Sequence, residues 1–545
     1  GNINDSVYFA KLAGAGESFE LFSSIDIKGL NDLSGAINSP GKTDYMTEAM
    51  RSLNQGLYSD AIDACEKELR LRKNDPSMFR VFGQALMGAG KVGQSISAFQ
   101  AAVHFEPDHA ETLLHLGSAY YHAAEPHLAM ACHQAAFETM EDAAATLAEA
   151  SHMHAGYSAS SWPDLVKVSA KWVKSQRPRK AAEPDVLNVP DRNDSDKEVP
   201  HVGFLFDRAC ESDDLRYIEP LLLNIDRNRL VVSVYAKETP KDPIPRRLSN
   251  LCAHWMDISN STDSMVVNVM KYHNVDVLID ATVTPSGHRP GIIAARPADH
   301  LLNWLAPSSG VFSKLYDQSL SDLGEAASVV AFDSARFPAV KGEAPARSHG
   351  YVTFSATCDF SKISPDVVCT WARILRSAPD SRLILGNVDT IPDDIIRRAH
   401  ELFSAFGAVD RVEFAVLGAK DHSDRLIKQM EFLVASDVFL DTFPTGSGGD
   451  VALALWCGLP TITMGGGNSY GQSAGIARAA GMGDWVASNR SGYIKKAISA
   501  ASAVSDTENG RVTAHESVKS SRLFQPQQWA QSLSDALYDL VKNKA

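Results

Sequence analysis

VFLDTFPTGSGGDVALALWCGLPTITM, residues 438–464, is the stretch that says most about the architecture of this sequence. An apolar run ends at Asp441, a glycine-rich loop follows, and an apolar helix-length segment leads into a second β-branched run at 461–464. Buried strands that alternate with helices predict a parallel sheet covered on both faces. The glycines allow close approach to the backbone, and the free N–H groups of the next helix suit a phosphate. The stretch therefore predicts an anion or nucleotide site, with a plain tight turn as the alternative.

The same alternation of strands and helices extends through the second half of the chain. A similar alternation occurs earlier in the sequence. Apolar runs recur at 351–357, 382–388 and 412–418. An earlier series, HVGFLF, VVSVYA, DVLIDA and HLLNWLA, begins at residue 201. Two series of similar length predict two doubly wound domains that face a cleft, with ligands beyond the carboxyl ends of the strands. We expect a last helix over 526–543 to pack back across both domains.

A repeat precedes the two series. A step of 34 residues separates Gly56 from Gly90 and Gly90 from Ala124. This period resembles the tetratricopeptide repeat (TPR), a helix pair in which small residues allow close packing. Such pairs stack into a curved solenoid whose concave face can hold an extended peptide, or which only braces the next domain. The small residues that keep the step are Ala61, Ser95, Ala129, Ala64, Ala98 and Cys132.

Composition excludes several classes of protein. Of the 545 residues, 44% are hydrophobic and 22% are charged, so wholesale disorder is excluded. A formal net charge of −14 disfavours broad binding to nucleic acid or to an anionic membrane. No apolar run predicts a transmembrane helix, and the first 20 residues do not resemble a signal peptide. The seven scattered cysteines form no CxxC pair, so we expect buried thiols in a reducing, cytoplasmic compartment.

Three segments resemble glycosyltransferase family 41, the O-GlcNAc transferase group. Residues 438–464 are similar to its nucleotide-sugar segment, and 352–385 to its Lys-Ile-x-Pro and Trp-x-x-Ile-Leu stretch. Residues 294–310 are similar to its Arg-Pro-Ala and Pro-Gly-Thr-Ser-Gly segment. With the repeats, the likeness covers about 45–540. It implies a helical TPR solenoid followed by a GT-B fold of two doubly wound parallel-sheet domains, generally without a metal.

The expected organisation follows from the resemblance and from the composition along the chain. A stretch rich in proline and charge separates the repeats from the first strand series. The expected parts are an N-terminal extension at 1–44, TPR-like helical repeats at 45–174, a linker at 175–200, a GT-B N-terminal domain at 201–345, a GT-B C-terminal nucleotide-sugar-binding domain at 346–525 and a C-terminal helix at 526–545.

Lys362 is the first candidate site residue. The resemblance places the family's donor-diphosphate lysine there, and a cation at a strand-to-helix turn would offset the charge of a departing nucleoside diphosphate. Without the resemblance, a lone lysine is usually a surface residue. The donor-binding candidates are Lys362, Lys420, His422, Gly446, Ser447, Gly448, Gly449 and Asp450, and the sugar or acceptor loop comprises Pro307, Ser308, Ser309 and Gly310.

Direct transfer of a sugar also needs a base that accepts the proton of the acceptor hydroxyl. The loop at 207–214, beyond the first strand of the earlier series, carries four carboxylates. The catalytic candidates are Asp207, Glu211 and Asp213, together with Lys362 at the leaving group. Asp280 and His288 are alternative bases. For each of these groups the simpler interpretation is a solvated loop charge.

The sequence departs from the family at several of its functional positions. Ser212 stands where the family has a histidine near the acceptor, and Leu453 stands where it has a ribose-contacting aspartate. Gly448, Gly449 and Asp450 replace a His/Gly-Thr-Thr run, so Asp450 either complements the helix dipole or binds ribose hydroxyls. These changes leave the identity of the donor and of the catalytic residues open.

Two hypotheses follow. The first is a cytoplasmic protein glycosyltransferase, inverting and metal-independent, without a cofactor, that moves a sugar onto Ser or Thr of a polypeptide held by the repeats. Flagellin or another surface protein is a plausible acceptor. A UDP-sugar is the favoured donor, and CMP- and GDP-sugars remain open; no nucleic acid or membrane span is expected. The alternative is a TPR scaffold whose GT-B domain is catalytically degenerate.

Overall fold

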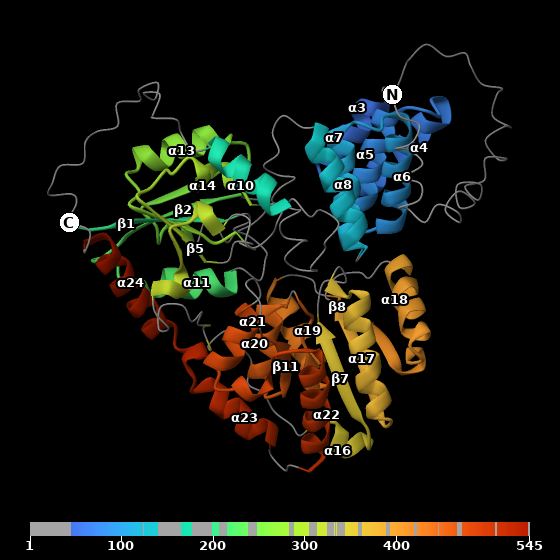
Figure 1. Cartoon of the computed structure of the whole chain (residues 1–545), viewed down its shortest axis with the longest axis vertical. Helices are drawn as coiled ribbons and strands as arrows, with labels where there is room; N and C mark the ends of the chain where they lie inside the picture. Colours follow the sequence, from blue (N-terminus) through green and yellow to red (C-terminus); the bar gives the residue numbers. More distant parts are fainter. Residues whose placement is uncertain are drawn as a thin grey trace. The chain divides into compact units, whose positions relative to one another are not determined.

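A computed structural model of the chain shows a helical unit and a larger unit that contains two sheets (Figure 1). Each unit is described by itself. The residues that the structure describes are 45–123, 125–139, 165–176, 199–206, 215–237, 248–282, 288–304, 313–323, 332, 334, 344–357, 362–387, 393–418, 422–444, 446–465, 471–506 and 510–542.

The helical unit consists of antiparallel helix pairs that follow the predicted 34-residue step. Its helices are α3 (Tyr45–Asn54), α4 (Tyr58–Leu71), α5 (Pro76–Gly88), α6 (Val92–Phe105), α7 (Ala110–His122) and α8 (Pro126–Thr139). A further described helix, α10 (Leu165–Gln176), precedes the first sheet in the sequence.

Small residues allow the paired helices to cross closely. Ala61, Ser95 and Ala129 are fully buried. A methyl group added at Gly83 would come within 2.6 Å of the ring of Phe99 on the paired helix. The prediction of a helical N-terminal region built on this period is confirmed.

The first sheet is parallel and has the strand order β3-β2-β1-β4-β5-β6. The runs that begin at 201, 231, 276 and 300 form four of its strands, as expected from their apolar content. The strands are β1 (His201–Phe206), β2 (Val231–Ala236), β3 (His254–Asp257), β4 (Val277–Asp280), β5 (His300–Asn303) and β6 (Gln318–Ser319), and the helices are α11 (Leu215–Asn224), α13 (Asp263–Tyr272) and α14 (Pro290–Ala294).

The second sheet repeats this topology, with the order β12-β11-β10-β7-β8-β9. In each sheet the first strand along the chain pairs with the second and the fourth, so the direction of winding reverses beside it. The strands are β7 (Val352–Thr357), β8 (Ser381–Asn387), β9 (Val412–Val416), β10 (Val438–Leu440), β11 (Thr461–Met464) and β12 (Val486–Ala487).

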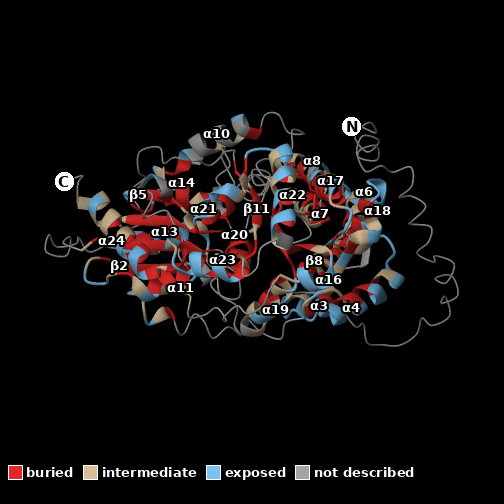
Figure 2. Cartoon of the chain, turned by 90° about the horizontal axis from the view of Figure 1, so that it is seen from below, coloured by how far each residue is buried: buried red, intermediate tan, exposed pale blue. Residues whose placement is uncertain are grey.

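The C-terminal half also contains the helices that follow these strands and close the chain. They are α16 (Ala346–His349), α17 (Pro365–Ser377), α18 (Asp393–Ala405), α19 (His422–Val434), α20 (Gly448–Trp456), α21 (Gly471–Ala479), α22 (Arg490–Asp506), α23 (Gly510–Lys519) and α24 (Pro526–Lys542). The strands of both sheets are mostly buried, while most of the helices expose one face (Figure 2) and α20 is buried throughout. Two doubly wound parallel sheets were predicted, and this prediction is confirmed.

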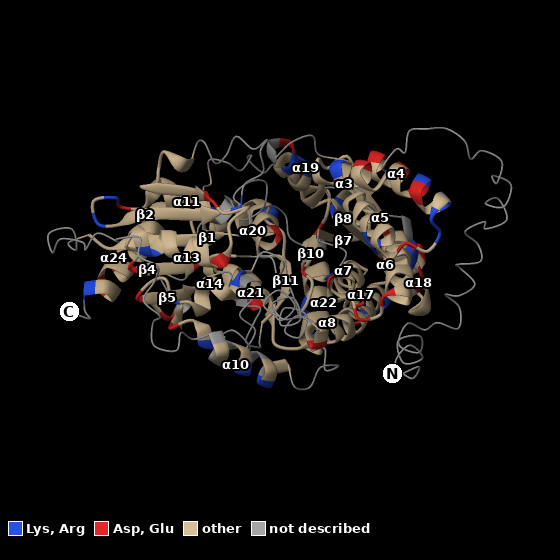
Figure 3. Ribbon diagram, turned by 90° about the horizontal axis from the view of Figure 1, so that it is seen from above, with Lys and Arg blue, Asp and Glu red and all other residues tan. Residues whose placement is uncertain are grey.

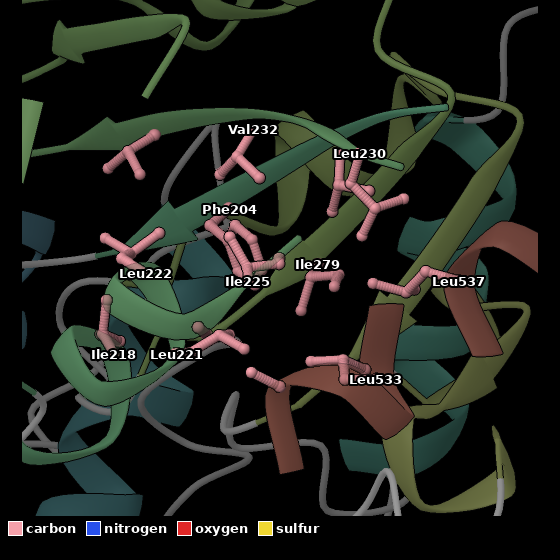
Figure 4. Close-up of a cluster of buried hydrophobic side chains, with 14 of the residues drawn as sticks. Phe204, Ile218, Leu221, Leu222, Ile225, Leu230, Val232, Ile279, Leu533 and Leu537 are labelled. Atoms are coloured by element: carbon pink, nitrogen blue, oxygen red, sulfur yellow. The ribbon is translucent and has the colours of Figure 1, made fainter. Parts of the chain in front are cut away.

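The core of the first sheet includes residues from the end of the chain. Leu533 and Leu537 of α24 lie in the same buried cluster as Phe204 of β1 and Ile279 of β4 (Figure 4). The helix expected over 526–543 is therefore present and packs against the first sheet. No helix in the described part of the chain is long and apolar enough to cross a membrane. On the described helices, acidic and basic residues are interspersed (Figure 3).

Candidate functional site

Lys362 reaches the glycine-rich loop of the second sheet. It lies in the segment between β7 and α17, next to the switch in winding direction, and is partly buried. Its Nζ donates to the carbonyl of Gly446, at 3.2 Å, and to the hydroxyl of Ser447, at 2.9 Å. The ammonium group therefore lies against the loop that leads into α20, at the edge where parallel sheets bind ligands.

Asp441 is hydrogen-bonded to this glycine-rich loop. It follows β10 and is only 1% exposed. Its Oδ1 accepts a hydrogen bond from the Ser447 N–H at 3.0 Å, and its Oδ2 accepts one from the Thr463 hydroxyl at 2.7 Å. Its main-chain carbonyl accepts from the Tyr493 hydroxyl at 2.7 Å. Burial raises the pKa of the Asp441 carboxyl, and the Ser447 N–H, the Thr463 hydroxyl and the charge of Lys362 offset this rise in part.

Gly446 leaves no room for a side chain. A Cβ at this position would lie 2.3 Å from the Ser473 hydroxyl and 2.5 Å from Asp441 Oδ2. The loop can therefore pass over the carboxylate only because residue 446 is glycine.

The first turn of α20 continues the site. Gly448, Gly449 and Asp450 begin this helix and are buried. Gln429 Nε2 of α19 donates to Asp450 Oδ1 at 3.4 Å. An acidic side chain here complements the positive end of the helix dipole, which supports the capping alternative for Asp450. The glycines leave the first N–H groups of the helix uncovered by side chains of their own.

The structure thus brings Lys362, Gly446 and Ser447 into contact and places Gly448, Gly449 and Asp450 directly after them. The other predicted site residues cannot be placed. Asp207, Glu211, Asp213, Pro307, Ser308, Ser309, Gly310 and Lys420 lie outside the described residues, as does the side chain of His422 at the start of α19.

The first sheet carries a different cluster at the corresponding strand end. The Tyr316 hydroxyl donates to Asp280 Oδ2 at 2.6 Å, and the Thr282 N–H donates to Oδ1 at 3.1 Å. His288 Nε2 lies 3.0 Å from the Tyr316 hydroxyl and 3.3 Å from Asp280 Oδ2. The side chains of Asp280 and His288 are at most 1% exposed. Both alternative bases are thus buried and paired within this cluster.

The pKa of Asp280 reflects two opposing effects. Burial raises it, but the hydrogen bond and charge of His288, with the Tyr316 and Thr282 donors, outweigh burial, so the pKa lies below its usual value. Burial and the Asp280 carboxylate raise the pKa of Tyr316 well above normal. The cluster stabilises a buried carboxylate within the domain itself.

Sequence reasoning missed Asp441, Thr463 and Tyr316. Asp441 had a visible signal, since VFLD and DVLID each end a buried strand with an aspartate. Tyr316 had none, because nothing in its neighbours links it to Asp280. Among the described residues there is no group of three or more His, Cys, Asp or Glu side chains arranged to hold a metal ion.

Two doubly wound parallel sheets of this order are the arrangement of the GT-B fold. Residues 348–533 match the model of glycosyl transferase family 41. The C-terminal part of the chain is therefore similar to glycosyl transferase family 41, and the resemblance predicted from the sequence is confirmed.

Curated relatives and one solved structure are also similar to this chain. A tomato protein named "Probable UDP-N-acetylglucosamine--peptide N-acetylglucosaminyltransferase SPINDLY" is 26% identical over 56% of this chain and 35% of its own length. The Petunia hybrida protein of the same name is 27% identical over 51% of this chain and 31% of its own. The chain thus spans about a third of the length of these relatives. The structure of an O-GlcNAc transferase variant from Thermobaculum terrenum superposes with a TM-score of 0.76 and 19% identity, covering 92% of this chain and 98% of that one. This superposition confirms the fold.

Proposed function

We propose that the chain is a protein glycosyltransferase that transfers a sugar from a nucleotide-sugar donor to a polypeptide. The observation that carries the proposal is the contact of Lys362 Nζ with Gly446 and Ser447, at the carboxyl edge of a family 41-type domain. A diphosphate placed there would meet the ammonium group and the first N–H groups of α20. Both favour the negative charge that develops on the leaving group.

The reaction requires a base as well as leaving-group stabilisation. We assign the base to the loop at 207–214, where Asp207, Glu211 and Asp213 are the candidates. The closed Asp280–His288–Tyr316 cluster supports this choice, because its side chains are already paired with one another. Attack by the acceptor hydroxyl opposite the departing diphosphate would invert the anomeric carbon. Lys362 and the helix N-terminus would replace a metal at the diphosphate.

The donor and the acceptor are proposed from the names of the relatives and from the helical repeats. The names of the plant relatives specify a UDP-N-acetylglucosamine donor and a peptide acceptor, which favours a UDP-sugar here. CMP- and GDP-sugars remain candidates, because Asp450 changes the chemistry of the donor loop. We propose that the helical repeats bind the polypeptide and that the modified residue is Ser or Thr, with flagellin or another surface protein as a candidate. A cytoplasmic location remains a prediction of the sequence.

Calorimetric titration with UDP, GDP and CMP tests the donor site. We expect one nucleotide to bind the wild-type chain and the Lys362→Ala variant to bind it at least about tenfold more weakly, since a charge-assisted contact is lost. Lys428→Ala is the matched control, because Lys428 is an exposed lysine of α19 that pairs with Glu431. Its affinity should equal that of the wild type.

Transfer itself is tested by the intact mass of a candidate acceptor protein expressed with and without this chain. A mass increase that disappears with Lys362→Ala would establish transfer. If no nucleotide bound, and the heats of the wild type and Lys362→Ala were the same, the alternative of a scaffold with a degenerate transferase domain would be favoured instead.

A further inference from the structure

A buried carboxylate next to the proposed diphosphate site is unfavourable unless its charge is neutralised. Asp441 contacts the loop through Ser447, whose hydroxyl in turn contacts Lys362 Nζ. The groups that face the Asp441 carboxyl come from four elements. They are Lys362 before α17, the Ser447 N–H before α20, the Thr463 hydroxyl of β11 and the Ser473 hydroxyl of α21. Tyr493 of α22 contacts the main-chain carbonyl of Asp441.

Among these facing groups, Lys362 supplies the positive charge. A bound diphosphate would draw that charge to itself and would bring its own negative charge close to the carboxylate. Both changes favour the protonated form of Asp441. The existing hydrogen bonds tolerate a proton, because the Thr463 hydroxyl can accept a hydrogen bond as well as donate one.

We propose that Asp441 is a positioning residue of the donor site and that its carboxylate takes up one proton from solvent when a nucleotide sugar binds beside Lys362. This inference rests on the proposed function. In the empty site, the carboxylate holds Ser447 and, through it, the loop and Lys362. In the occupied site, the carboxylic acid keeps the Ser447 contact without repelling the diphosphate. The proton returns to solvent when the nucleotide leaves, so donor affinity rises as the pH falls.

The experiment is calorimetric titration of UDP-GlcNAc into the full chain at pH 7, in two buffers with different ionisation enthalpies. A sugar nucleotide is the right probe, because it lacks the terminal phosphate that titrates near pH 6. We expect a net uptake of between a fraction of a proton and one proton. The affinity for UDP-GlcNAc should weaken by up to about tenfold for each unit by which the pH rises between pH 6 and 8, which is the limit for one coupled proton.

Asp441→Asn is the matched variant, because its amide oxygen can accept from the Ser447 N–H and its NH2 group can donate to the Thr463 hydroxyl, while the charge is lost. We expect Asp441→Asn to bind UDP-GlcNAc without proton uptake and with little dependence on pH. Asp441→Ala removes the acceptor of the Ser447 N–H, so we expect about tenfold weaker binding at every pH. Thr463→Val provides a second test should Asp441→Asn not fold, since loss of one donor should shift the pH dependence to higher pH.

The outcomes separate this inference from the proposed function. Binding without proton uptake by the wild type, or equal pH dependence in the wild type and Asp441→Asn, would overturn the inference alone. Failure of the wild type to bind any of the tested nucleotides or UDP-GlcNAc would overturn the donor site and the inference with it.

Discussion

Asp280 and Asp441 stand at corresponding places in two sheets of the same topology, and their surroundings differ. Asp280 is the last residue of β4, and Asp441 directly follows β10; each of these strands is the fourth in its sheet along the chain. Asp280 is enclosed by His288 and Tyr316 from its own domain. Asp441 accepts a hydrogen bond from the Ser447 N–H of the glycine-rich loop, and the Ser447 hydroxyl contacts Lys362.

The difference shows which properties come from the fold and which come from side chains. In both sheets an aspartate lies at the carboxyl end of a strand beside the point where the direction of winding reverses, which is where such sheets bind ligands. Burial raises the pKa of both carboxyls. The neighbours of Asp280 outweigh burial and lower its pKa, whereas those of Asp441 offset burial only in part, so its pKa stays raised. At the first sheet the aspartate is paired within a self-contained cluster, while at the second it contacts a glycine-rich loop that also contacts Lys362. We expect the first cluster to stabilise its domain, and the second is the proposed donor site.

The largest effect expected from this contrast is on stability. Asp280→Ala leaves His288 and Tyr316 buried without their carboxylate, and breaking such a pair costs about 3–5 kcal/mol. We expect a strongly lowered urea midpoint of the sheet unit. Glu413→Ala is the control, because Glu413 pairs with Arg382 at the surface and should cost about 1 kcal/mol or less. Equal effects of the two variants would mean that the cluster does not stabilise the first sheet.

The next effect is on binding at the second sheet. A methyl group in Gly446→Ala would meet Asp441 Oδ2 and Ser473, and such overpacking costs about 1–3 kcal/mol. We expect nucleotide affinity to fall between about tenfold and a hundredfold by calorimetry. Gly475→Ala on α21 is the control, because no atom lies within 4 Å of a Cβ there. Unchanged affinity in Gly446→Ala would argue against a ligand over this loop.

A matched pair of hydroxyl deletions compares the two carboxylates directly. Tyr316→Phe and Thr463→Val each remove one hydroxyl that donates to Oδ2 of the respective aspartate. Each deletion should cost about 1.5 kcal/mol, a typical value for a hydrogen bond to a charged group. Only Thr463→Val should change nucleotide binding. A loss of nucleotide affinity in Tyr316→Phe would show that the first cluster also serves the donor site.

The sequence predicted the architecture better than the site. Apolar runs and the 34-residue step are local patterns, so they were sufficient to predict both sheets and the helix pairs. Lys362 and the loop at 446–450 could be identified because glycine spacing and family resemblance mark them. The Asp280–Tyr316 contact could not, because it joins residues from separate elements that only the folded sheet brings together. The difference in neighbours between Asp280 and Asp441 is likewise a property of packing, because both segments end a buried strand with an aspartate.

The smallest predicted effect is the opposite response of the two carboxylates to pH. The lowered pKa of Asp280 means that its contribution to stability is present above the ordinary value of 3.8 and is lost as the pH falls through the lower folded value. The raised pKa of Asp441 has the reverse sign: its ionisation costs stability, which is lost as the pH rises above 3.8 toward the higher folded value. At pH 7, Asp441→Asn should therefore match or exceed the wild type in stability by up to about 1 kcal/mol, the range of a mild substitution. Asp280→Asn should be less stable than the wild type at the same pH, because its amide cannot replace the charge beside His288. Urea midpoints of the three proteins at pH 3, 5 and 7 measure this difference, because the contribution of Asp280 changes only below pH 3.8. Loss of stability in both variants to the same extent would mean that the two strand ends are electrostatically equivalent.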